Sequence, residues 1–244
     1  MNLYERLFGQ DKPGVWVLID PDSLDLPELV VNAQAAETGG ANAILVGGSF
    51  LSHDRFDESV RQIKEAVKLP VILFPGNSRQ LSRHADGMLF TSLLSGRNPQ
   101  YLIGEQVMAA PLVMRMRLAT IPTAYLLVES GRMTSAQFIS DTNPIPADKP
   151  ELALAHAQAA KLLGMRAVYL EAGSGAEHPV PPAMIRMVAK GVDLAVIVGG
   201  GIRCVEDGVA AVTAGAKVIV VGTIIEKLGG AFVEELTEAV RSRH

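Results

Sequence analysis

A tyrosine and a glutamate precede a loop with few side chains in the segment YLEAGSGA, residues 169–176. Tyr169 and Glu171 are two residues apart, so in a β-strand their side chains face the same side. The glycines of residues 173–175 would let backbone N–H groups approach an anion closely. We interpret Glu171 as a general base, or as the group that orients a ligand hydroxyl, beside an anion site. The alternative is a turn in which Glu171 only pairs with a loop cation.

Two further glycine motifs come late in the chain, VGGGIR at 198–203 and VGT at 221–223. They follow two apolar runs, and in α/β barrels this position commonly binds phosphate through backbone N–H groups and a helix N-terminus. One glycine triplet alone is typical of a tight turn. Two such loops, together with residues 173–175, favour a phosphorylated ligand.

Oxygen ligands for a metal ion follow the first two apolar runs. The motif IDPD contains Asp20 and Asp22, and VGGS contains Ser49. Carboxylate and hydroxyl oxygens suit Mg²⁺, which proteins usually hold with one or two carboxylates plus phosphate oxygens of the substrate. Asp20 is the stronger candidate because it ends the run. Asp22 or Ser23 could instead cap the helix expected near Pro27.

Composition limits the class of protein. Of the 244 residues, 48% are hydrophobic and only 5% aromatic, which is typical of a parallel sheet covered by helices. A net charge of −4 without a basic run indicates no nucleic acid and no anionic membrane as partner. There is one cysteine, no apolar run of membrane-spanning length and no signal-type segment at the start. We therefore expect a cytoplasmic protein without stable membrane insertion.

Eight short runs, apolar on both faces, alternate with helix-length amphipathic stretches. This pattern predicts parallel strands in βα repeats. The expected strands are 15–20, 43–48, 70–76, 87–92, 123–130, 166–173, 194–201 and 217–223.

Eight βα units close naturally into an α/β fold of the (β/α)₈ TIM-barrel type, and no linker divides the chain. We therefore predict one domain over residues 1–244, with an open doubly wound sheet as the alternative. A barrel places catalytic groups at the carboxyl ends of its strands. Asp20, Ser49 and Glu171 all stand at such ends.

Seven motifs in order carry a resemblance to a known family: LIDPD, ILVGGS, LFPGN, TSLLSGRNPQYLIGEQ, YLEAGSGA, VGGGIR and VGT. From about residue 15 to 230 the chain resembles the geranylgeranylglyceryl phosphate synthases and their heptaprenylglyceryl phosphate relatives. The resemblance implies a (β/α)₈ barrel that transfers a prenyl group from a prenyl diphosphate to the 3-hydroxyl of sn-glycerol 1-phosphate, with Mg²⁺ as cofactor.

The resemblance also implies roles for individual residues. Asp20 and Ser49 would hold Mg²⁺, and Glu171, with Tyr169, would act at the acceptor hydroxyl. The glycerol phosphate would be bound by Tyr169, Leu170, Glu171, Ala172, Gly173, Ser174, Gly175, Gly200, Gly201, Gly222 and Thr223.

Two features indicate the second branch of this family. Residues 95–106 resemble a variant connection after strand four that accommodates the prenyl chain. One branch has a lysine where this chain has Leu18, and the other often has one where this chain has Ser23. Leu18 and the 95–106 segment point to the second branch, which implies the geranylgeranyl donor and a homo-oligomer, a dimer or a hexamer.

Two rival functions are weighed against this one. Another phosphate-handling barrel enzyme, an isomerase or a thiamin-phosphate-type transferase, would share the glycine loops but would not need an apolar groove. A non-catalytic barrel that binds a phosphorylated metabolite would bind its ligand without turnover.

Overall fold

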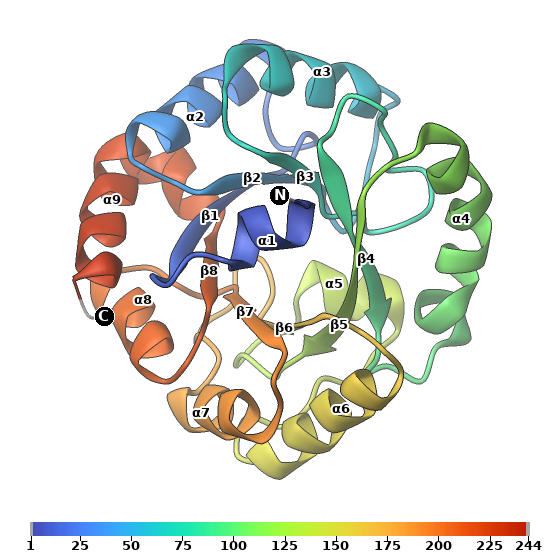
Figure 1. Cartoon of the computed structure of the whole chain (residues 1–244), viewed down its shortest axis with the longest axis vertical. Helices are drawn as coiled ribbons and strands as arrows, with labels where there is room; N and C mark the ends of the chain where they lie inside the picture. Colours follow the sequence, from blue (N-terminus) through green and yellow to red (C-terminus); the bar gives the residue numbers. More distant parts are fainter. Residues whose placement is uncertain (1, 243–244) are drawn as a thin grey trace.

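The computed structural model describes residues 2–242, without the side chains of 226 and 227. Eight parallel strands pair in chain order and close into a barrel, with β1 beside β8 (Figure 1). The predicted (β/α)₈ barrel and its eight strands are therefore confirmed. The strands are β1 (Gly14–Ile19), β2 (Ala43–Val46), β3 (Val71–Leu73), β4 (Gly87–Leu93), β5 (Thr120–Leu127), β6 (Ala167–Glu171), β7 (Ala195–Gly199) and β8 (Val218–Val221).

Helices surround the barrel (Figure 1), and within the described residues none is both long and apolar enough to cross a membrane. They are α1 (Leu3–Phe8), α2 (Leu26–Thr38), α3 (Phe56–Ala66), α4 (Glu105–Met116), α5 (Ser135–Ser140), α6 (Pro150–Leu162), α7 (Pro182–Gly191), α8 (Val205–Thr213) and α9 (Thr223–Arg241).

The first helix after a strand, α2, begins at a capping box. The Asp25 side chain accepts the Glu28 N–H at 2.9 Å, and the Glu28 carboxylate accepts the Asp25 N–H at 3.0 Å. These bonds satisfy N–H groups that the first helical turn leaves unpaired. The cap of this helix is thus Asp25, and the alternative that Asp22 or Ser23 caps it is wrong.

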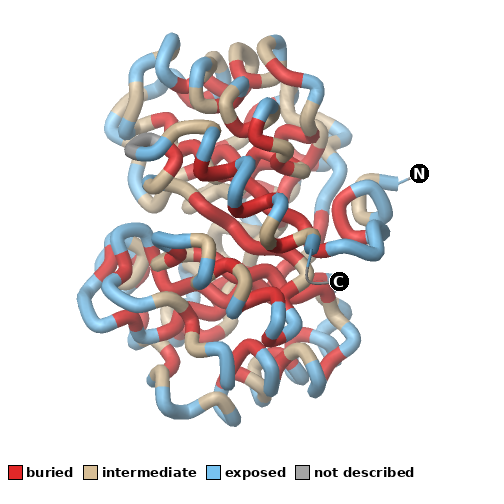
Figure 2. The backbone as a smooth tube through the Cα atoms, turned by 90° about the vertical axis from the view of Figure 1, so that its left-hand side faces the viewer, coloured by how far each residue is buried: buried red, intermediate tan, exposed pale blue. Residues whose placement is uncertain are grey.

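Strand alternation divides the core into two layers. In β1, Trp16 faces the barrel interior, whereas Val17 and Ile19 face the surrounding helices. Successive side chains of a strand point to opposite faces, so every strand contributes to both layers. Figure 2 shows the result as a buried interior beneath exposed outer helical faces.

Two connections depart from the regular repeat. The expected variant connection after β4 starts with a π-helical turn, Gln100–Gly104, and continues as α4. The connection after β3, residues 74–86, contains no helix at all. The outer face of the barrel beside β3 and β4 therefore lacks one of its covering helices.

The amino-terminal end of the barrel is closed by α1, which lies across it (Figures 1 and 2). Phe8 packs on Trp16 with 5.4 Å between ring centroids, and Tyr4 packs on Phe8 at 4.8 Å. The guanidinium of Arg166 lies 3.7 Å from the ring centroid of Tyr4. Aromatic side chains thus fill this end of the interior.

Candidate active site

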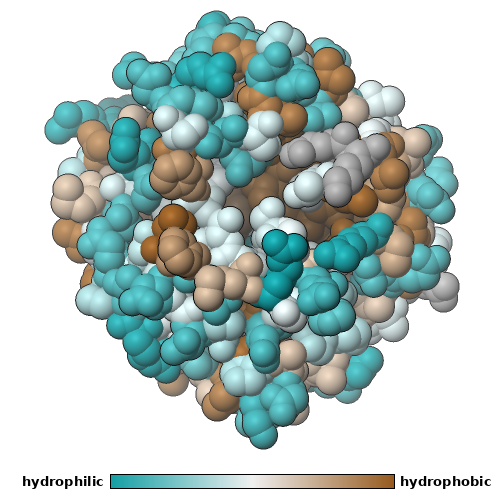
Figure 3. Space-filling view, turned by 180° about the vertical axis from the view of Figure 1, so that it is seen from behind, coloured by the Kyte–Doolittle hydropathy of each residue, from teal (hydrophilic) through white to brown (hydrophobic). Residues whose placement is uncertain are grey.

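A cavity of about 710 Å³ opens at the carboxyl ends of the strands. Every one of the eight strand ends contributes lining residues, from Asp20 after β1 to Thr223 after β8. Figure 3 shows the opening, with apolar residues in its depth. The cavity lies where α/β barrels carry their active sites.

Three aromatic rings form the floor of the cavity. Phe74 stacks on Tyr169 at 4.9 Å with an interplanar angle of 10°, and Tyr125 packs against both rings. Burial, and then the charge of Glu171, raises the pKa of both tyrosines, so they stay protonated at neutral pH. The Tyr169 hydroxyl is buried and lies near the Glu171 carboxylate, where it favours the charged form of that group.

Glu171 lies at the end of β6 above this floor and is 5% exposed. Its Oε1 accepts the Gly173 N–H at 2.6 Å. Burial raises the pKa of Glu171 from 4.5 to about 7, although the Gly173 hydrogen bond opposes the shift. A carboxyl group with a pKa near neutrality can both accept and release a proton, which suits a general base.

Glycines surround this carboxylate because side chains would not fit. Gly173, Gly200 and Gly201 have φ of 98°, 78° and 72°. A Cβ at Gly200 would lie 2.3 Å from Oε1 of Glu171, and a Cβ at Gly201 would lie 2.7 Å from the His178 carbonyl oxygen. The loops after β6 and β7 are thus in direct backbone contact beside the cavity.

Gly222 differs from these glycines. Its φ is −127°, and a Cβ there would meet protein atoms only at 3.5 Å or more. It precedes α9, whose first residues Thr223 and Ile224 line the cavity. The N–H groups of a first helical turn attract anions, so this end of α9 adds to the glycine loops.

Most residues of the 169–175 segment line the cavity, namely Tyr169, Glu171, Gly173, Ser174 and Gly175. Leu170 and Ala172 do not, and both pack in the outer layer against the helices. Neither side chain therefore faces the cavity, so any contact of these two residues with a ligand would come from their backbone. The reason is the alternation of β6, which turns every second side chain away from the interior.

Asp20 and Ser49 lie together on the opposite side of the cavity. A Cβ at Gly48 would lie 2.6 Å from both carboxylate oxygens of Asp20, so the carboxylate stands directly over Gly48, next to Ser49. Within the described residues, no group of three His, Cys, Asp or Glu side chains could hold a metal. One carboxylate and one hydroxyl fit Mg²⁺ whose other ligands are water and substrate oxygens.

Asp22 has its partners outside this site. Its Oδ1 accepts the Ser52 N–H at 2.8 Å and the Ser52 Oγ–H at 3.0 Å, and it lies 3.3 Å from His53 Nε2. It does not line the cavity. Asp22 therefore ties the loop after β1 to the loop after β2.

The cavity has an apolar branch. The sequence indicated an apolar surface near residues 95–106 but not its position over β4. Met88 and Phe90 line it, yet both pack with the outer layer, whereas Leu89 between them faces the interior. The cavity thus reaches the outer face of β4, where the connection after β3 lacks a helix. Residues 77–86, NSRQLSRHAD, show no helical apolar repeat, and this signal could have revealed the gap.

Leu18 and Ser23, the two positions where the family resemblance implied a lysine, both line the cavity. Cationic side chains come from elsewhere on the rim, from Arg132 and Arg203. Arg203 also donates to the Ala176 carbonyl oxygen and so spans the loops after β6 and β7. Sequence reasoning did not single out either arginine.

Solved structures of similar shape support this reading of the fold. A (S)-3-O-geranylgeranylglyceryl phosphate synthase from Thermoplasma acidophilum, solved with its substrate sn-glycerol-1-phosphate, matches with a TM-score of 0.94 and 36% identity over 99% of both chains. A thiamine phosphate pyrophosphorylase from Pyrococcus furiosus matches with a TM-score of 0.61 at 16% identity, over 99% of this chain and 98% of that one. The second likeness shows a shared fold alone.

Two relatives in sequence carry the same name. A geranylgeranylglyceryl phosphate synthase from Korarchaeum cryptofilum is 48% identical over 99% of this chain and 100% of its own length. Another, from Chitinophaga pinensis, is 42% identical over 93% of this chain and 89% of its own. The PcrB family model matches residues 12–240. With that match, and a barrel whose glycine loops, buried carboxylate and apolar branch open into one cavity, the chain belongs to the PcrB family.

Proposed function

We propose that this protein is a prenyltransferase that joins a geranylgeranyl group to the 3-hydroxyl of sn-glycerol 1-phosphate. One observation carries the proposal: a single cavity combines a glycine-lined anion site, a buried carboxyl group beside it and an apolar branch over β4. The anion site suits the acceptor phosphate, the carboxyl group suits the acceptor hydroxyl, and the apolar branch suits the prenyl tail of the donor. The relatives named above are consistent with the same reaction.

The acceptor would sit between β6 and α9. Backbone N–H groups around Gly200, Gly201 and Gly222, with Thr223 and Ser174, would hold its phosphate. This places the far end of the glycerol near Glu171 and the Tyr169 hydroxyl. Glu171 in its ionised form then takes the proton of the 3-hydroxyl, whose oxygen forms the new ether bond.

The donor diphosphate would lie at Asp20 and Ser49, which would hold Mg²⁺. When bound, Mg²⁺ neutralises charge on the departing diphosphate. In the reaction, the bond between the first prenyl carbon and the diphosphate oxygen breaks, and the same carbon bonds to the glycerol oxygen. Diphosphate leaves with the electron pair of the broken bond, and Glu171 keeps the proton.

The apolar tail of the donor would follow the branch of the cavity over β4. Met88, Phe90, Leu93 and Ala109 line this branch, and Tyr101 from the π-helical turn lies at its wall. An isomerase or a simple phosphate-binding protein would have no use for such a surface. This branch favours the prenyl transfer over both rivals.

We further propose that the protein works in the cytoplasm as a homo-oligomer. Support for the oligomer comes from large apolar side chains on the outer face of α4, where Val107, Met108 and Met114 are exposed. Such a contiguous patch is typical of an interface. Light scattering of the purified protein measures the mass directly.

The proposed activity is tested by incubating the protein with Mg²⁺, labelled sn-glycerol 1-phosphate and prenyl diphosphates of several lengths. We expect a labelled ether lipid, with the geranylgeranyl donor used most efficiently. Tight acceptor binding without product would support the non-catalytic rival. Turnover of a phosphorylated substrate without any prenyl donor would support the isomerase rival.

A further inference from the structure

Gln80 is a fully buried polar residue on a loop. It lies in the helix-free connection after β3 and is 0% exposed. Side chains of this type are mostly exposed, and on a loop they are seldom buried without a specific set of partners. Its partners are backbone groups on both sides of the metal end of the cavity.

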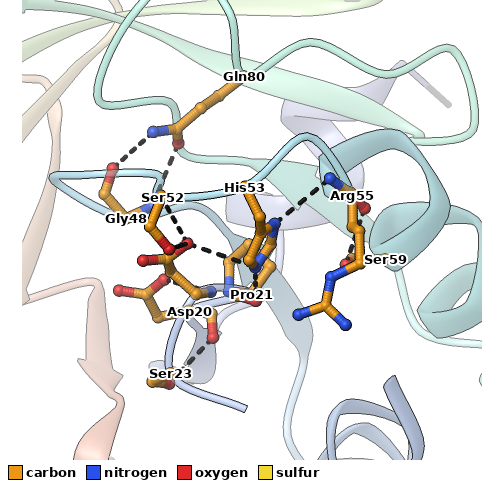
Figure 4. Close-up of polar contacts among 10 residues, drawn as sticks. Asp20, Pro21, Ser23, Gly48, Ser52, His53, Arg55, Ser59 and Gln80 are labelled. Atoms are coloured by element: carbon orange, nitrogen blue, oxygen red, sulfur yellow. Dashed lines mark hydrogen bonds and ion pairs between the residues drawn. The ribbon is translucent and has the colours of Figure 1, made fainter. Parts of the chain in front are cut away.

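The carboxamide of Gln80 makes three hydrogen bonds. Nε2 donates to the Gly48 carbonyl oxygen at 2.7 Å, and Oε1 accepts the Gly48 N–H at 3.2 Å (Figure 4). Oε1 also accepts the Gly76 N–H at 3.2 Å. The side chain thus bonds both the N–H and the C=O of Gly48, as a neighbouring strand would. It also joins the loop after β2 to the loop after β3.

These bonds stand where the sheet ends. The ladder between β2 and β3 finishes at the pair Val46 and Leu73, followed by a bond from the Phe74 N–H to the Val46 carbonyl oxygen. Beyond it the two backbones touch, because a Cβ at Gly47 would lie 1.8 Å from the Phe74 carbonyl oxygen. Gln80 replaces the missing ladder at this point.

The segment that Gln80 holds is the one on which Asp20 rests. The Asp20 carboxylate stands directly over Gly48, and Ser49 is the next residue. The other end of the same loop is tied by Asp22 through Ser52. We infer that Gln80 is a positioning residue that fixes Gly48, and through it Asp20 and Ser49, for the donor diphosphate and Mg²⁺.

This inference rests on the proposed placement of the donor at Asp20 and Ser49. It is tested by calorimetric binding, which needs no turnover. The wild type, Gln80→Met and Gln80→Asn are titrated with inorganic pyrophosphate in the presence of Mg²⁺, and separately with sn-glycerol 1-phosphate. The control is Ile63→Ala, a core truncation on α3 that lowers the melting temperature without touching the cavity.

We expect Gln80→Met to weaken magnesium pyrophosphate binding by about 10-fold or more, as for residues that orient metal ligands. Gln80→Asn keeps the amide but has a shorter reach, so its loss of affinity for magnesium pyrophosphate should be intermediate. This variant provides the test if Gln80→Met does not fold. Acceptor affinity should change less than about 2-fold, because neither substitution removes a hydrogen bond to the acceptor.

Wild-type affinity for magnesium pyrophosphate in both Gln80 variants would overturn the inference. Equal losses of affinity for pyrophosphate and acceptor would also overturn it, because they indicate a general loosening of the fold. A wild type that binds no magnesium pyrophosphate would overturn it as well. A wild type that binds both ligands but forms no prenyl product refutes the proposed reaction and leaves the role of Gln80 standing.

Discussion

At the amino-terminal end of the barrel Phe8 packs on Trp16, whereas at the carboxyl-terminal end a cavity of about 710 Å³ stays open between the same strands. Both ends are lined by inward side chains of one sheet. At the closed end these are large and apolar, and α1 covers them. At the open end glycines replace them, and the remaining polar groups face the cavity.

The side chains at the closed end therefore serve the stability of the fold, whereas those at the open end serve binding and catalysis. Phe8 and Trp16 at the closed end do not line the cavity of the candidate active site, so substitutions there should mainly change the free energy of unfolding. Side chains at the open end include a buried carboxyl group with a raised pKa, which weakens the fold at neutral pH in exchange for reactivity. The following substitutions test whether effects on stability and on catalysis separate between the two ends of the barrel.

The largest effect is expected for Asp20→Asn. Asparagine keeps the size but removes the negative charge that Asp20 contributes to the proposed Mg²⁺ site beside Ser49. We expect kcat/KM to fall at least about 10³-fold while the melting temperature stays close to that of the wild type. Steady-state kinetics over a range of Mg²⁺ concentrations measures this. Near-normal activity at saturating Mg²⁺ would remove Asp20 from the site.

Glu171→Gln should have the second largest effect. Glutamine can hold the hydrogen bond from Gly173 but cannot take a proton, so kcat should fall about 10²-fold or more with little change in acceptor affinity. In the wild type, kcat/KM should rise as the pH passes through about 7, and this rise should be missing in the variant. An unchanged kcat would leave the glycine loops as a phosphate site without a base.

The same substitution tests stability against pH. The folded protein holds the Glu171 proton up to about pH 7, while the unfolded chain releases it near 4.5. Between these values the folded state binds more protons, so its stability decreases as the pH rises, by on the order of 3 kcal/mol. Chemical denaturation at pH 4.5 and pH 8 should show this decrease in the wild type and a smaller one in Glu171→Gln.

The two glycine loops should respond differently to one added methyl group. Gly200→Ala places a Cβ 2.3 Å from Glu171 Oε1 at a φ of 78°, so we expect acceptor KM to rise about 10-fold and stability to fall by about 1–2 kcal/mol. Gly222→Ala meets no protein atom within 3.5 Å, so its KM should change about 3-fold or less. Equal effects in both variants would show that local contact does not decide tolerance here.

The smallest effect on catalysis is expected for Phe8→Ala. The substitution removes the ring that covers Trp16 and should cost about 3 kcal/mol of unfolding free energy. The kinetic constants of the folded protein should stay within about 2-fold of the wild type, since the change lies at the closed end. Thermal melting and assays at low temperature separate the two quantities. A large loss of kcat would show that the two ends are coupled.

Residue patterns were enough to predict the barrel, because each strand is buried on both faces and stands between amphipathic helices. They also located Asp20, Ser49, Glu171 and the glycine loops, since all follow strand ends. Leu170 and Ala172 were included through the family motif as a whole, and the alternation of β6 turns their side chains to the outer layer. Gln80 was missed because its role depends on contacts with Gly48 and Gly76, which no local pattern encodes.

Residues in and just after α1, at the closed end, contact residues from the second half of the barrel. Tyr4 donates to the carbonyl oxygen of Arg166, a residue synthesised 162 positions later, and Lys217 Nζ contacts the carbonyl oxygens of Gln10 and Asp11. On the ribosome α1 must therefore wait for the second half of the barrel before it can dock. Trp16 is the only tryptophan and lies beneath Phe8, so its fluorescence should report when α1 docks on the barrel during refolding.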